Sequence, residues 1–375
     1  MKKCGANVAV LGSTGSIGRQ SLEVIRSLGK NYRVVSLAAH SNYRLLLKQA
    51  EEFKPECVCV TSHHAYNIAK NKIKNVKILP PDELDSIAQS KETDILLAGS
   101  AGSRALTAIY AALKKGKTVA LANKEPIVMA GDILKKTAEK YGGRIIPVDS
   151  EHSALFQLLE NSSVRPEKIY ITSSGGSMFK KKTKNITPEF ILAHPVWKMG
   201  KKITVDSSTG MNKGMEVIEA HHLFGFPFAR IKVLLHPQAL VHGMIEFADG
   251  SVFAYISQPD MKIPINYALA RPVKPALKNF MNFSKTNISF KEFPAAKFPC
   301  FSLAVEAGKT GGIYPSVLCG ANETAVNAFL VRKIPFGRIP VLIEKTLGKT
   351  PKMNYNIKNA LEAEKWAAQY AGGLI

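Results

Sequence analysis

Short apolar segments alternate with amphipathic segments of helical period through the first 150 residues. Each apolar segment has the length and the β-branched content of a buried strand. This alternation predicts a parallel, doubly wound sheet covered by helices, and sheets of that kind bind ligands at the carboxyl ends of their strands. The predicted strands span residues 7–12, 33–39, 56–61, 93–98, 117–121 and 144–148.

The pattern changes after about residue 150, where an α+β arrangement replaces the strict alternation. Residues 168–174 predict a strand, a long polar stretch covers 174–202, and residues 231–257 contain a predicted hairpin with Asp249-Gly250 as its turn. Residues 271–299 are proline-rich with little periodicity and are interpreted as a connecting segment. From about residue 300 the chain has helical period. The fold class is therefore α/β, with an α+β middle part and a helical end.

Composition places the chain among globular proteins. Its 375 residues correspond to about two or three domains, and 46% hydrophobic against 21% charged residues suffice for a sizeable core. No uninterrupted apolar run is long enough to span a bilayer, and the amino-terminal residues lead directly into a strand, so no membrane or targeting segment is expected. Five cysteines without framework spacing favour a reducing cytoplasm.

The formal net charge of +22 raises the question of a polyanionic partner such as nucleic acid or anionic lipid. Most of the basic residues are lysines spread along the whole chain, without a basic stripe interleaved with aromatic residues. This distribution favours a lysine-rich solvated surface and predicts no nucleic-acid partner. A nucleic-acid-binding protein remains the alternative of a different class, and it requires affinity that falls steeply with salt.

Three glycines, Gly12, Gly15 and Gly18, stand three residues apart where a predicted strand turns into a predicted helix. In that context the backbone N–H groups and the amino terminus of the helix face an anion, as in dinucleotide-binding loops. The alternative is a glycine turn without a ligand. The motif predicts a nicotinamide cofactor whose pyrophosphate lies on this loop.

The end of the second predicted strand distinguishes NADP from NAD. An NAD site usually carries Asp or Glu there to bind the ribose 2′-hydroxyl. This chain has "LAAHSNYR" (37–44) without a carboxylate, so Ser41, Asn42 and either His40 or Arg44 are candidates to accept a 2′-phosphate. The residues favour NADP.

Acidic residues from two distant segments are candidates for a metal site. Asp149 and Glu151 follow the last predicted strand of the sheet, and in extended geometry their side chains point the same way. Residues 206–224 add Glu216 and Glu219 where a helix is predicted to begin. An all-oxygen site favours Mg²⁺ or Mn²⁺ over zinc. The alternative is that two acids at a helix start interact with the helix dipole alone.

Serine- and glycine-rich turns at 171–177 and 205–210, followed by Asn212-Lys213, can hold a second phosphate, that of a substrate. The alternative is a pair of ordinary polar loops. Residues 194–200 place a histidine, a tryptophan and a methionine within a polar stretch, which favours a lid over a ligand. The alternative there is a local hydrophobic tether.

Six motifs occur together and in order: "GSTGSIG" (12–18), "LANKE" (121–125), "PVDSEH" (147–152), "HPVWKMG" (194–200), "DSSTGMNKGMEVIEA" (206–220) and "QPDMKIPI" (258–265). With this combination the chain resembles the 1-deoxy-D-xylulose 5-phosphate reductoisomerases over essentially its full length. The resemblance implies a cytoplasmic homodimer and four segments: a Rossmann-like NADPH-binding domain (1–149), a catalytic domain (150–270) with a flexible flap at about 174–202, a connecting segment (271–299) and a C-terminal helical bundle (300–375).

The resemblance also implies a role for individual residues. Asp149, Glu151 and Glu216 would hold Mg²⁺ or Mn²⁺, and together with Lys124 and His194 they would be the catalytic residues. Lys124, Ser150 and His194 would contact the substrate near the metal, and Glu151 and Glu216 would touch it as well. The substrate phosphate would lie on Ser174, Ser207, Asn212 and Lys213, with Trp197 as the flap aromatic and Met261 as a wall of the pocket. The NADPH site would consist of Thr14, Gly15, Ser16, Ile17, His40, Ser41, Asn42, Asn123, Glu125 and Gly200.

The implied reaction is the first committed step of the non-mevalonate isoprenoid pathway. The metal stabilises enolate or alkoxide charge while a carbon–carbon bond breaks and reforms by retro-aldol and aldol steps. The resulting aldehyde takes a hydride from NADPH, which gives 2-C-methyl-D-erythritol 4-phosphate. Binding of the small phosphorylated sugar through its remote phosphate would drive closure of the flap and exclude water.

Four positions depart from the family pattern. Gly210, Val196, Ser41 and Ala239 stand where many members carry Met, Asn, Lys and Ser, and none of them is a proposed metal ligand. The alternative enzyme is another NADP-dependent dehydrogenase, of the semialdehyde or homoserine type. Such an enzyme would need no set of metal-binding carboxylates.

Overall fold

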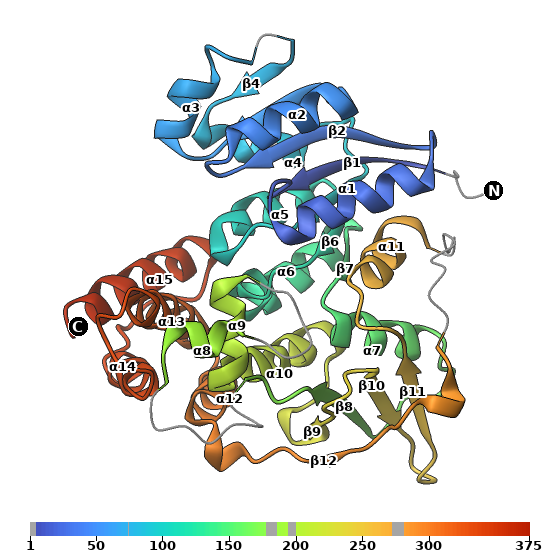
Figure 1. Ribbon diagram of the computed structural model, residues 1–375, viewed down its shortest axis with the longest axis vertical. Helices are drawn as coiled ribbons and strands as arrows, with labels where there is room; N and C mark the ends of the chain where they lie inside the picture. The colour runs from blue at the N-terminus through green and yellow to red at the C-terminus, as the bar shows by residue number, and fades with distance from the viewer. Residues whose placement is uncertain (1–4, 74, 178–185, 194–199, 272–280) are drawn as a thin grey trace. The chain divides into compact units, whose positions relative to one another are not determined.

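The computed structural model describes residues 5–73, 75–177, 186–193, 200–271 and 281–375. The chain forms two compact units, each assembled from segments that are separate in the sequence (Figure 1). The first unit comprises Met1–Pro126, Leu134–Ser153 and Asp260–Asn279, and the second comprises Ile127–Ile133, Ala154–Pro259 and Phe280–Ile375. None of the described helices combines the length and the apolar composition that crossing a membrane requires. The four segments implied by the resemblance stay a prediction.

The first unit is built on a sheet of seven parallel strands in the order β4-β3-β2-β1-β5-β6-β7. From β1 the chain moves outward to β4 and then returns to β5 on the other side of β1, so the order reverses between β1 and β5. The strands are β1 (Ala6–Leu11), β2 (Tyr32–Ala39), β3 (Cys57–Val60), β4 (Lys77–Leu79), β5 (Ile95–Ala98), β6 (Thr118–Leu121) and β7 (Arg144–Pro147). All the predicted strands are present. β4 was not among the predicted strands, because three residues are too few to show a period.

Helices cover this sheet and share its core. Val8 of β1, Leu46 of α2 and Ile265 of α11 have no exposed surface and belong to one apolar cluster, which also includes α1 and α3. Burial of each such side chain contributes about 2 kcal/mol. The helices of this unit are α1 (Ser16–Leu28), α2 (Tyr43–Phe53), α3 (His63–Ala69), α4 (Leu84–Gln89), α5 (Leu106–Lys114) and α11 (Lys262–Ala270), with short 3₁₀ helices η1 (Pro81–Glu83) and η2 (Gly102–Ala105). α11 packs on α1, β6 and β7 although it follows them by more than a hundred residues.

The second unit contains a mixed five-stranded sheet in the order β11-β10-β8-β9-β12. β8 and β9 are parallel and the other pairs are antiparallel. The strands are β8 (Lys168–Ser173), β9 (Ile231–Leu235), β10 (Val241–Glu246), β11 (Val252–Ile256) and β12 (Lys291–Glu292). The predicted strand at 168–174 and the predicted hairpin are both confirmed. At the hairpin turn, Gly250 has φ +81° and Asp249 Oδ1 accepts a hydrogen bond from the Ser251 N–H.

Helices pack on this second sheet and form the carboxyl-terminal part of the chain. Leu155, Val217 and Ile171 bring together α7, α10 and β8 in one apolar cluster. The predicted helical end is confirmed, and α13 packs against both α14 and α15 (Figure 1). The helices are α7 (Ser150–Glu160), α8 (Pro188–Leu192), α9 (Lys201–Thr209), α10 (Met211–Phe224), α12 (Pro299–Thr310), α13 (Tyr314–Leu330), α14 (Arg338–Leu347) and α15 (Ile357–Gly372), with 3₁₀ helices η3 (Phe228–Arg230), η4 (Phe283–Lys285) and η5 (Ala295–Lys297). α6 (Glu125–Tyr141) has segments in both units.

Two local expectations are wrong. Residues 205–209, expected as a polar loop, are helical and end α9, which closes at Gly210 with φ +81°. A Cβ at Gly210 would lie 2.6 Å from Phe298 Cβ, so the packing there needs glycine as well. Asp149 and Glu151 do not lie in extended geometry, because α7 begins at Ser150 and Glu151 is in its first turn.

Candidate functional site

The glycine-rich loop between β1 and α1 is closely packed on itself. Gly12 has φ +76°, and a Cβ at Gly18 would lie 2.3 Å from the Gly12 carbonyl oxygen. Gly15 precedes α1 as its N-cap and has no side chain, so the first amides of the helix, those of Ser16 and Ile17, have no side-chain cap. Uncapped N–H groups at a helix amino terminus attract anions through hydrogen bonding and the helix dipole.

Substitution of Gly18 tests this loop. In Gly18→Ala the added methyl group would meet backbone atoms of Gly12 and Ser13, so the loop must shift. We expect the dissociation constant for NADPH to rise at least about 30-fold and the unfolding free energy to fall by about 2 kcal/mol. Titration calorimetry and urea unfolding measure the two effects. Gly337→Ala is the matched control, because no atom lies within 4 Å of the added methyl there, and it should change neither quantity.

Two buried polar atoms lie at the neighbouring strand ends. Asn123 follows β6 and Ser100 follows β5, and the Asn123 Oδ1 and Ser100 Oγ atoms are buried without a hydrogen-bond partner among the described residues. The Asn123 Nδ2 atom is held by the Gly102 carbonyl oxygen at 2.7 Å, which fixes the orientation of the amide. Buried polar atoms without partners are costly. A ligand with donor groups at the carboxyl edge of this sheet therefore fits the residues present.

Side-chain contacts hold two of the residues that follow β2. His40 Nδ1 lies 3.1 Å from Thr61 Oγ1, which follows β3. The Asn42 carboxamide caps α2 by accepting a hydrogen bond from the Leu45 N–H at 3.2 Å. Ser41 between them is exposed. In the first unit, Thr14 and Gly15 follow β1, Ser16 and Ile17 begin α1, His40, Ser41 and Asn42 follow β2, and Asn123 and Glu125 follow β6. Gly200 is the N-cap of α9 in the second unit.

The Asp149 carboxylate contacts two basic side chains. Its side chain is 12% exposed; Lys124 Nζ donates to Oδ2, and His152 Nδ1 lies 2.9 Å from Oδ1. Burial acts to raise the pKa of Asp149, but the Lys124 ammonium and His152 outweigh it and hold that pKa well below its usual range. The carboxylate is therefore ionised at neutral pH.

Glu151 and Ser150 complete this cluster. The Ser150 hydroxyl donates to Glu151 Oε2 at 2.8 Å, and the Glu151 N–H donates to Asp149 Oδ1 at 3.2 Å. The chain turns into α7 here because Asp149 accepts from the backbone of the first helical turn. The first unit thus presents two adjacent carboxylates and no thiolate, which is a donor set for a hard divalent cation.

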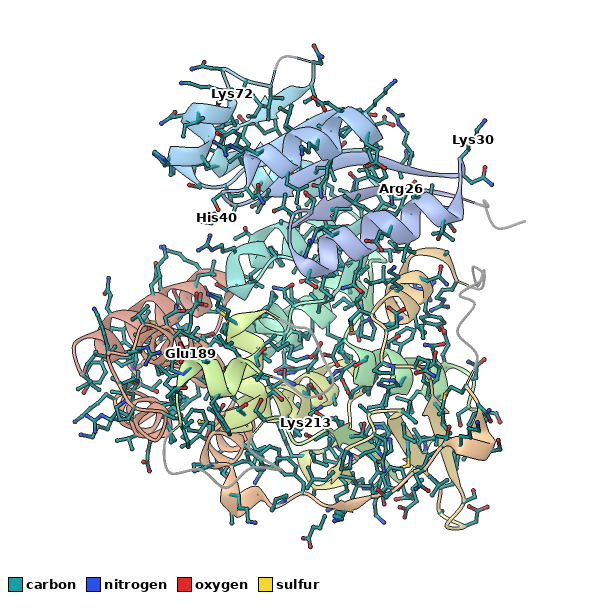
Figure 2. All side chains as sticks on the ribbon, in the orientation of Figure 1. Arg26, Lys30, His40, Lys72, Glu189 and Lys213 are labelled. Atoms are coloured by element: carbon teal, nitrogen blue, oxygen red, sulfur yellow. The ribbon has the colours of Figure 1, made fainter. Side chains whose placement is uncertain are left out.

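Glu216 is held in the second unit by its own helix. Its side chain is 1% exposed, and Lys213 Nζ lies 2.6 Å from Oε2 while Asn212 Nδ2 donates to Oε1 at 2.6 Å. Lys213, labelled in Figure 2, also donates to the Thr172 carbonyl oxygen at 2.7 Å and so joins α10 to the end of β8. Spacings of three and four residues put these side chains on one face of α10.

The serine-rich turn after β8 lies against α9. A Cβ at Gly176, which has φ +61°, would lie only 3.0 Å from Ser207 Oγ. Ser174 and Ser207 are both half-buried, and the Gly175 N–H donates to Ser173 Oγ at 3.3 Å. The second unit therefore brings the turn that contains Ser174 next to Ser207 and attaches it, through Thr172, to Lys213 and Asn212.

Sequence reasoning missed two residues that support these clusters. His152 is completely buried and bonds Asp149; its place three residues after Asp149 at a helix start was a usable signal. Asn322 of α13 donates to Asp206 Oδ1 at 2.8 Å, while Lys202 lies 2.8 Å from Oδ2. Asp206 precedes Ser207, so this pair anchors α9 from a helix 116 residues away, and no sequence pattern indicates such a contact.

Met261 is the N-cap of α11 and packs on the core of the first unit. His194 and Trp197 lie outside the described residues, as does part of the predicted flap.

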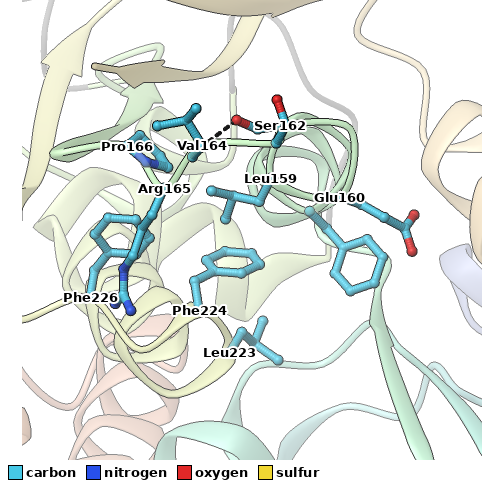
Figure 3. A pocket seen from close by; sticks show the side chains of 11 residues that line it. Leu159, Glu160, Ser162, Val164, Arg165, Pro166, Leu223, Phe224 and Phe226 are labelled. Atoms are coloured by element: carbon cyan, nitrogen blue, oxygen red, sulfur yellow. Dashed lines mark hydrogen bonds between the residues drawn. The ribbon is translucent and has the colours of Figure 1, made fainter. Parts of the chain in front are cut away.

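A pocket of about 450 Å³ lies apart from these clusters within the second unit (Figure 3). Its walls are mainly apolar and come from the ends of α7 and α10, with Arg165 over the Phe226 ring at 5.3 Å. The pocket contains none of the predicted site residues.

Comparison with known proteins gives a consistent result. Family models described as 1-deoxy-D-xylulose 5-phosphate reductoisomerase, its C-terminal domain and the DXP reductoisomerase C-terminal domain match residues 8–131, 145–224 and 256–370. A 1-deoxy-D-xylulose 5-phosphate reductoisomerase of Thermodesulfovibrio yellowstonii is 44% identical over 373 residues, which is 97% of this chain and 98% of that protein.

Solved structures agree. A DOX-P reductoisomerase in complex with NADPH, fosmidomycin and magnesium superposes with a TM-score of 0.93 at 35% identity, covering 98% of both chains. The 1-deoxy-D-xylulose 5-phosphate reductoisomerase from Zymomonas mobilis in complex with NADPH gives 0.88 at 36% identity, covering 99% of both. The chain described here belongs to the 1-deoxy-D-xylulose 5-phosphate reductoisomerase family.

Proposed function

We propose that the chain catalyses the NADPH- and divalent-metal-dependent conversion of 1-deoxy-D-xylulose 5-phosphate to 2-C-methyl-D-erythritol 4-phosphate, in non-mevalonate isoprenoid biosynthesis. Family membership over nearly the whole chain supports it. The observation that carries it is Asp149, an ionised carboxylate held between Lys124 and His152 next to Glu151. An ordinary dehydrogenase of the semialdehyde or homoserine type has no need of such a cluster.

NADPH is the proposed cofactor, and it supplies the hydride for the reduction. The uncapped start of α1 would bind its pyrophosphate through Gly15, Ser16 and Ile17, with Thr14 beside them. Asn123 and Glu125 would line the site, and His40, Ser41 and Asn42 would face the ribose phosphate. The buried Oδ1 of Asn123 gives the site an acceptor with a fixed orientation. Gly200 of the second unit completes the proposed set.

Mg²⁺ or Mn²⁺ is the proposed metal, with Asp149, Glu151 and Glu216 as its ligands. Each of these residues offers a carboxylate oxygen, the ligand atom that both ions prefer. The ion supplies positive charge that stabilises negative charge on oxygens of the substrate. Lys124, Ser150 and His194 would orient the substrate beside these acids, and the Lys124 ammonium would keep Asp149 ionised.

The substrate phosphate is proposed to bind Ser174, Ser207, Asn212 and Lys213. The short approach between Gly176 and Ser207, and the bond from Lys213 to Thr172, support a single cradle of hydroxyls, amides and one cation. Trp197 would be the flap aromatic over the bound sugar, and Met261 would form a wall of the pocket. Phosphate binding far from the reacting carbons would hold the sugar in place and exclude water.

The direct experiment is NADPH oxidation with 1-deoxy-D-xylulose 5-phosphate, with Mg²⁺ and then with excess EDTA. We expect turnover only with the metal, and 2-C-methyl-D-erythritol 4-phosphate as the product by mass spectrometry. Turnover that persists in EDTA would favour a metal-independent dehydrogenase. Affinity for RNA or DNA that falls steeply with salt, without NADPH oxidation, would favour the nucleic-acid-binding alternative.

We further propose a homodimer that pairs through the edge strand β11. Its side chains Val252, Phe253 and Ile256 are 47%, 55% and 37% exposed, and an apolar edge strand of this kind favours pairing with a second copy.

The variant Phe253→Lys tests this dimer. A lysine on the edge opposes strand pairing, so we expect the dimer dissociation constant to rise at least about 30-fold, as sedimentation velocity would measure. Phe283→Lys is the control, since Phe283 is 63% exposed but lies in η4. A dimer that survives Phe253→Lys unchanged would contradict pairing through β11.

The proposed compartment is the cytoplasm. The cysteines of the described residues are all free, and Cys59 and Cys300 are buried, which suits a reducing environment.

A further inference from the structure

The ribose 2′-phosphate of NADPH requires a cation, and the end of β2 does not supply an obvious one. His40, Ser41 and Asn42 stand there, and neither Ser41 nor Asn42 carries a charge. Arg44 is close in sequence and exposed, and it acts on the neighbouring Tyr43 hydroxyl, whose pKa it lowers. A cation on a neighbouring part of the sheet edge is therefore a second candidate for the selectivity of this chain for NADPH over NADH.

A pocket of about 400 Å³ lies at that edge, wholly within the first unit. Thr61 lines it after β3, Pro81 and Leu84 line it from η1 and α4, and Arg104 lines it from η2 after β5. The His40–Thr61 contact of 3.1 Å joins the pocket to the end of β2. His40 is labelled in Figure 2 at this edge of the unit. Residues that follow β3 and β5 thus line one hollow, and the end of β2 contacts its wall through His40. Its size falls in the range of small-ligand sites.

Arg104 is the cation of this pocket. It is exposed and makes no ion pair with any described residue. Burial and then the charge of Arg104 lower the pKa of His40, so the imidazole stays neutral at pH 7 and adds no second positive charge. The guanidinium is therefore within electrostatic range of His40 and available to an anion.

We propose that Arg104 binds the 2′-phosphate of NADPH and makes the chain selective for NADPH over NADH. A guanidinium presents a planar pair of donors that matches a phosphate, and an arginine near the ribose is a known means of accepting the 2′-phosphate on this type of sheet. His40 and Thr61 lie beside the phosphate, while Pro81 and Leu84 form the apolar wall of the pocket. This inference rests on the proposed NADPH dependence and assigns its selectivity to one residue.

The pocket also contains Asp82 and Asp85, which repel a phosphate and so limit where it lies. Asp85 Oδ1 accepts a hydrogen bond from Thr107 Oγ1 at 2.8 Å, which partly satisfies that carboxylate. Carboxylates accept hydrogen bonds from amino groups, and the adenine amino group is such a donor. The phosphate is therefore assigned to the Arg104–His40 part of the pocket and the base to the part with the acids.

The test compares two nucleotides that differ by one phosphate. Binding of 2′,5′-ADP and of 5′-AMP to the full chain is measured by titration calorimetry for the wild type, Arg104→Ala and Arg104→Lys. We expect Arg104→Ala to weaken 2′,5′-ADP at least about tenfold and to change 5′-AMP less than about twofold. Arg104→Lys should retain part of the preference for 2′,5′-ADP over 5′-AMP, because lysine keeps the positive charge but lacks the planar pair of donors.

Two further variants make the test specific. Arg33→Ala is the matched control, because Arg33 lies near the start of β2 and pairs with Glu56 at 3.3 Å with 55% of its side chain exposed. It should leave both affinities unchanged. Loss of the preference in Arg44→Ala but not in Arg104→Ala would overturn the inference, and so would equal weakening of both nucleotides by Arg104→Ala. A wild type that binds neither nucleotide would overturn the proposed NADPH dependence itself.

Discussion

Replacing Asp149 with asparagine is expected to lower turnover at saturating NADPH and Mg²⁺ by at least about 10³-fold. The substitution keeps the size of the side chain but removes the charge that a divalent ion needs. It also removes the negative charge that faces the buried Lys124 ammonium, so the geometry around the reacting atoms is disturbed as well. Initial rates with Mg²⁺ and a Mn²⁺ titration followed by paramagnetic resonance measure the loss of activity and of metal.

The controls separate chemistry from folding. Asp132→Asn changes a carboxylate that is 60% exposed and pairs with His222, and it should leave turnover and Mn²⁺ affinity unchanged. NADPH affinity of Asp149→Asn should stay within about threefold of the wild type, because the glycine-rich loop is intact. Turnover within tenfold of the wild type, at unchanged metal affinity, would remove Asp149 from the proposed metal site.

The second large effect is expected from Lys213. Changing it to methionine keeps the length of the side chain but removes the cation that lies 2.6 Å from the buried Glu216 carboxylate, so the unfolding free energy should fall by about 3 kcal/mol. Addition of Glu216→Gln should restore at least about 1 kcal/mol, because the buried negative charge is then gone. Urea unfolding of the two single variants and the double variant measures this coupling.

A surface pair provides the matched comparison for Lys213. Lys309 lies 2.7 Å from Glu306 with the same three-residue separation, but their side chains are 50% and 68% exposed. Lys309→Met should cost less than about 1 kcal/mol, because water screens the charge that remains. Equal effects of Lys213→Met and Lys309→Met would show that burial of the Glu216 pair contributes nothing.

Much of the fold follows from local pattern. The period of the apolar residues indicated the strands of the first sheet, and Asp249-Gly250 indicated the turn of the hairpin between β10 and β11. The pattern did not identify a very short strand, and it did not indicate that a helix begins directly after β7. β4 has three residues, and α7 starts at Ser150, so Glu151 belongs to a helical turn and not to an extended strand end.

In the candidate site, too, the sequence indicated some residues but not the contacts that support them. Acidic residues and serine-rich turns are visible in the sequence, and the proposed roles of Asp149, Glu151 and Glu216 are predictions from those residues and from the family. The supporting contacts were not predicted. The spacing of His152 from Asp149 was a local signal that the prediction did not use, whereas no sequence pattern places Asn322 near Asp206 or Arg104 near His40.

The sequence by itself determined the order of strands and helices along the chain, the tight glycine loop and the family. These depend on residue period, on contacts within one turn, and on motifs read in order. Only the tertiary structure decided which groups neutralise the buried charges. Lys124 meets Asp149 across 25 residues, and Asn322 meets Asp206 across 116. Such contacts depend on how strands and helices pack, and the sequence between the two partners contains no pattern that indicates them.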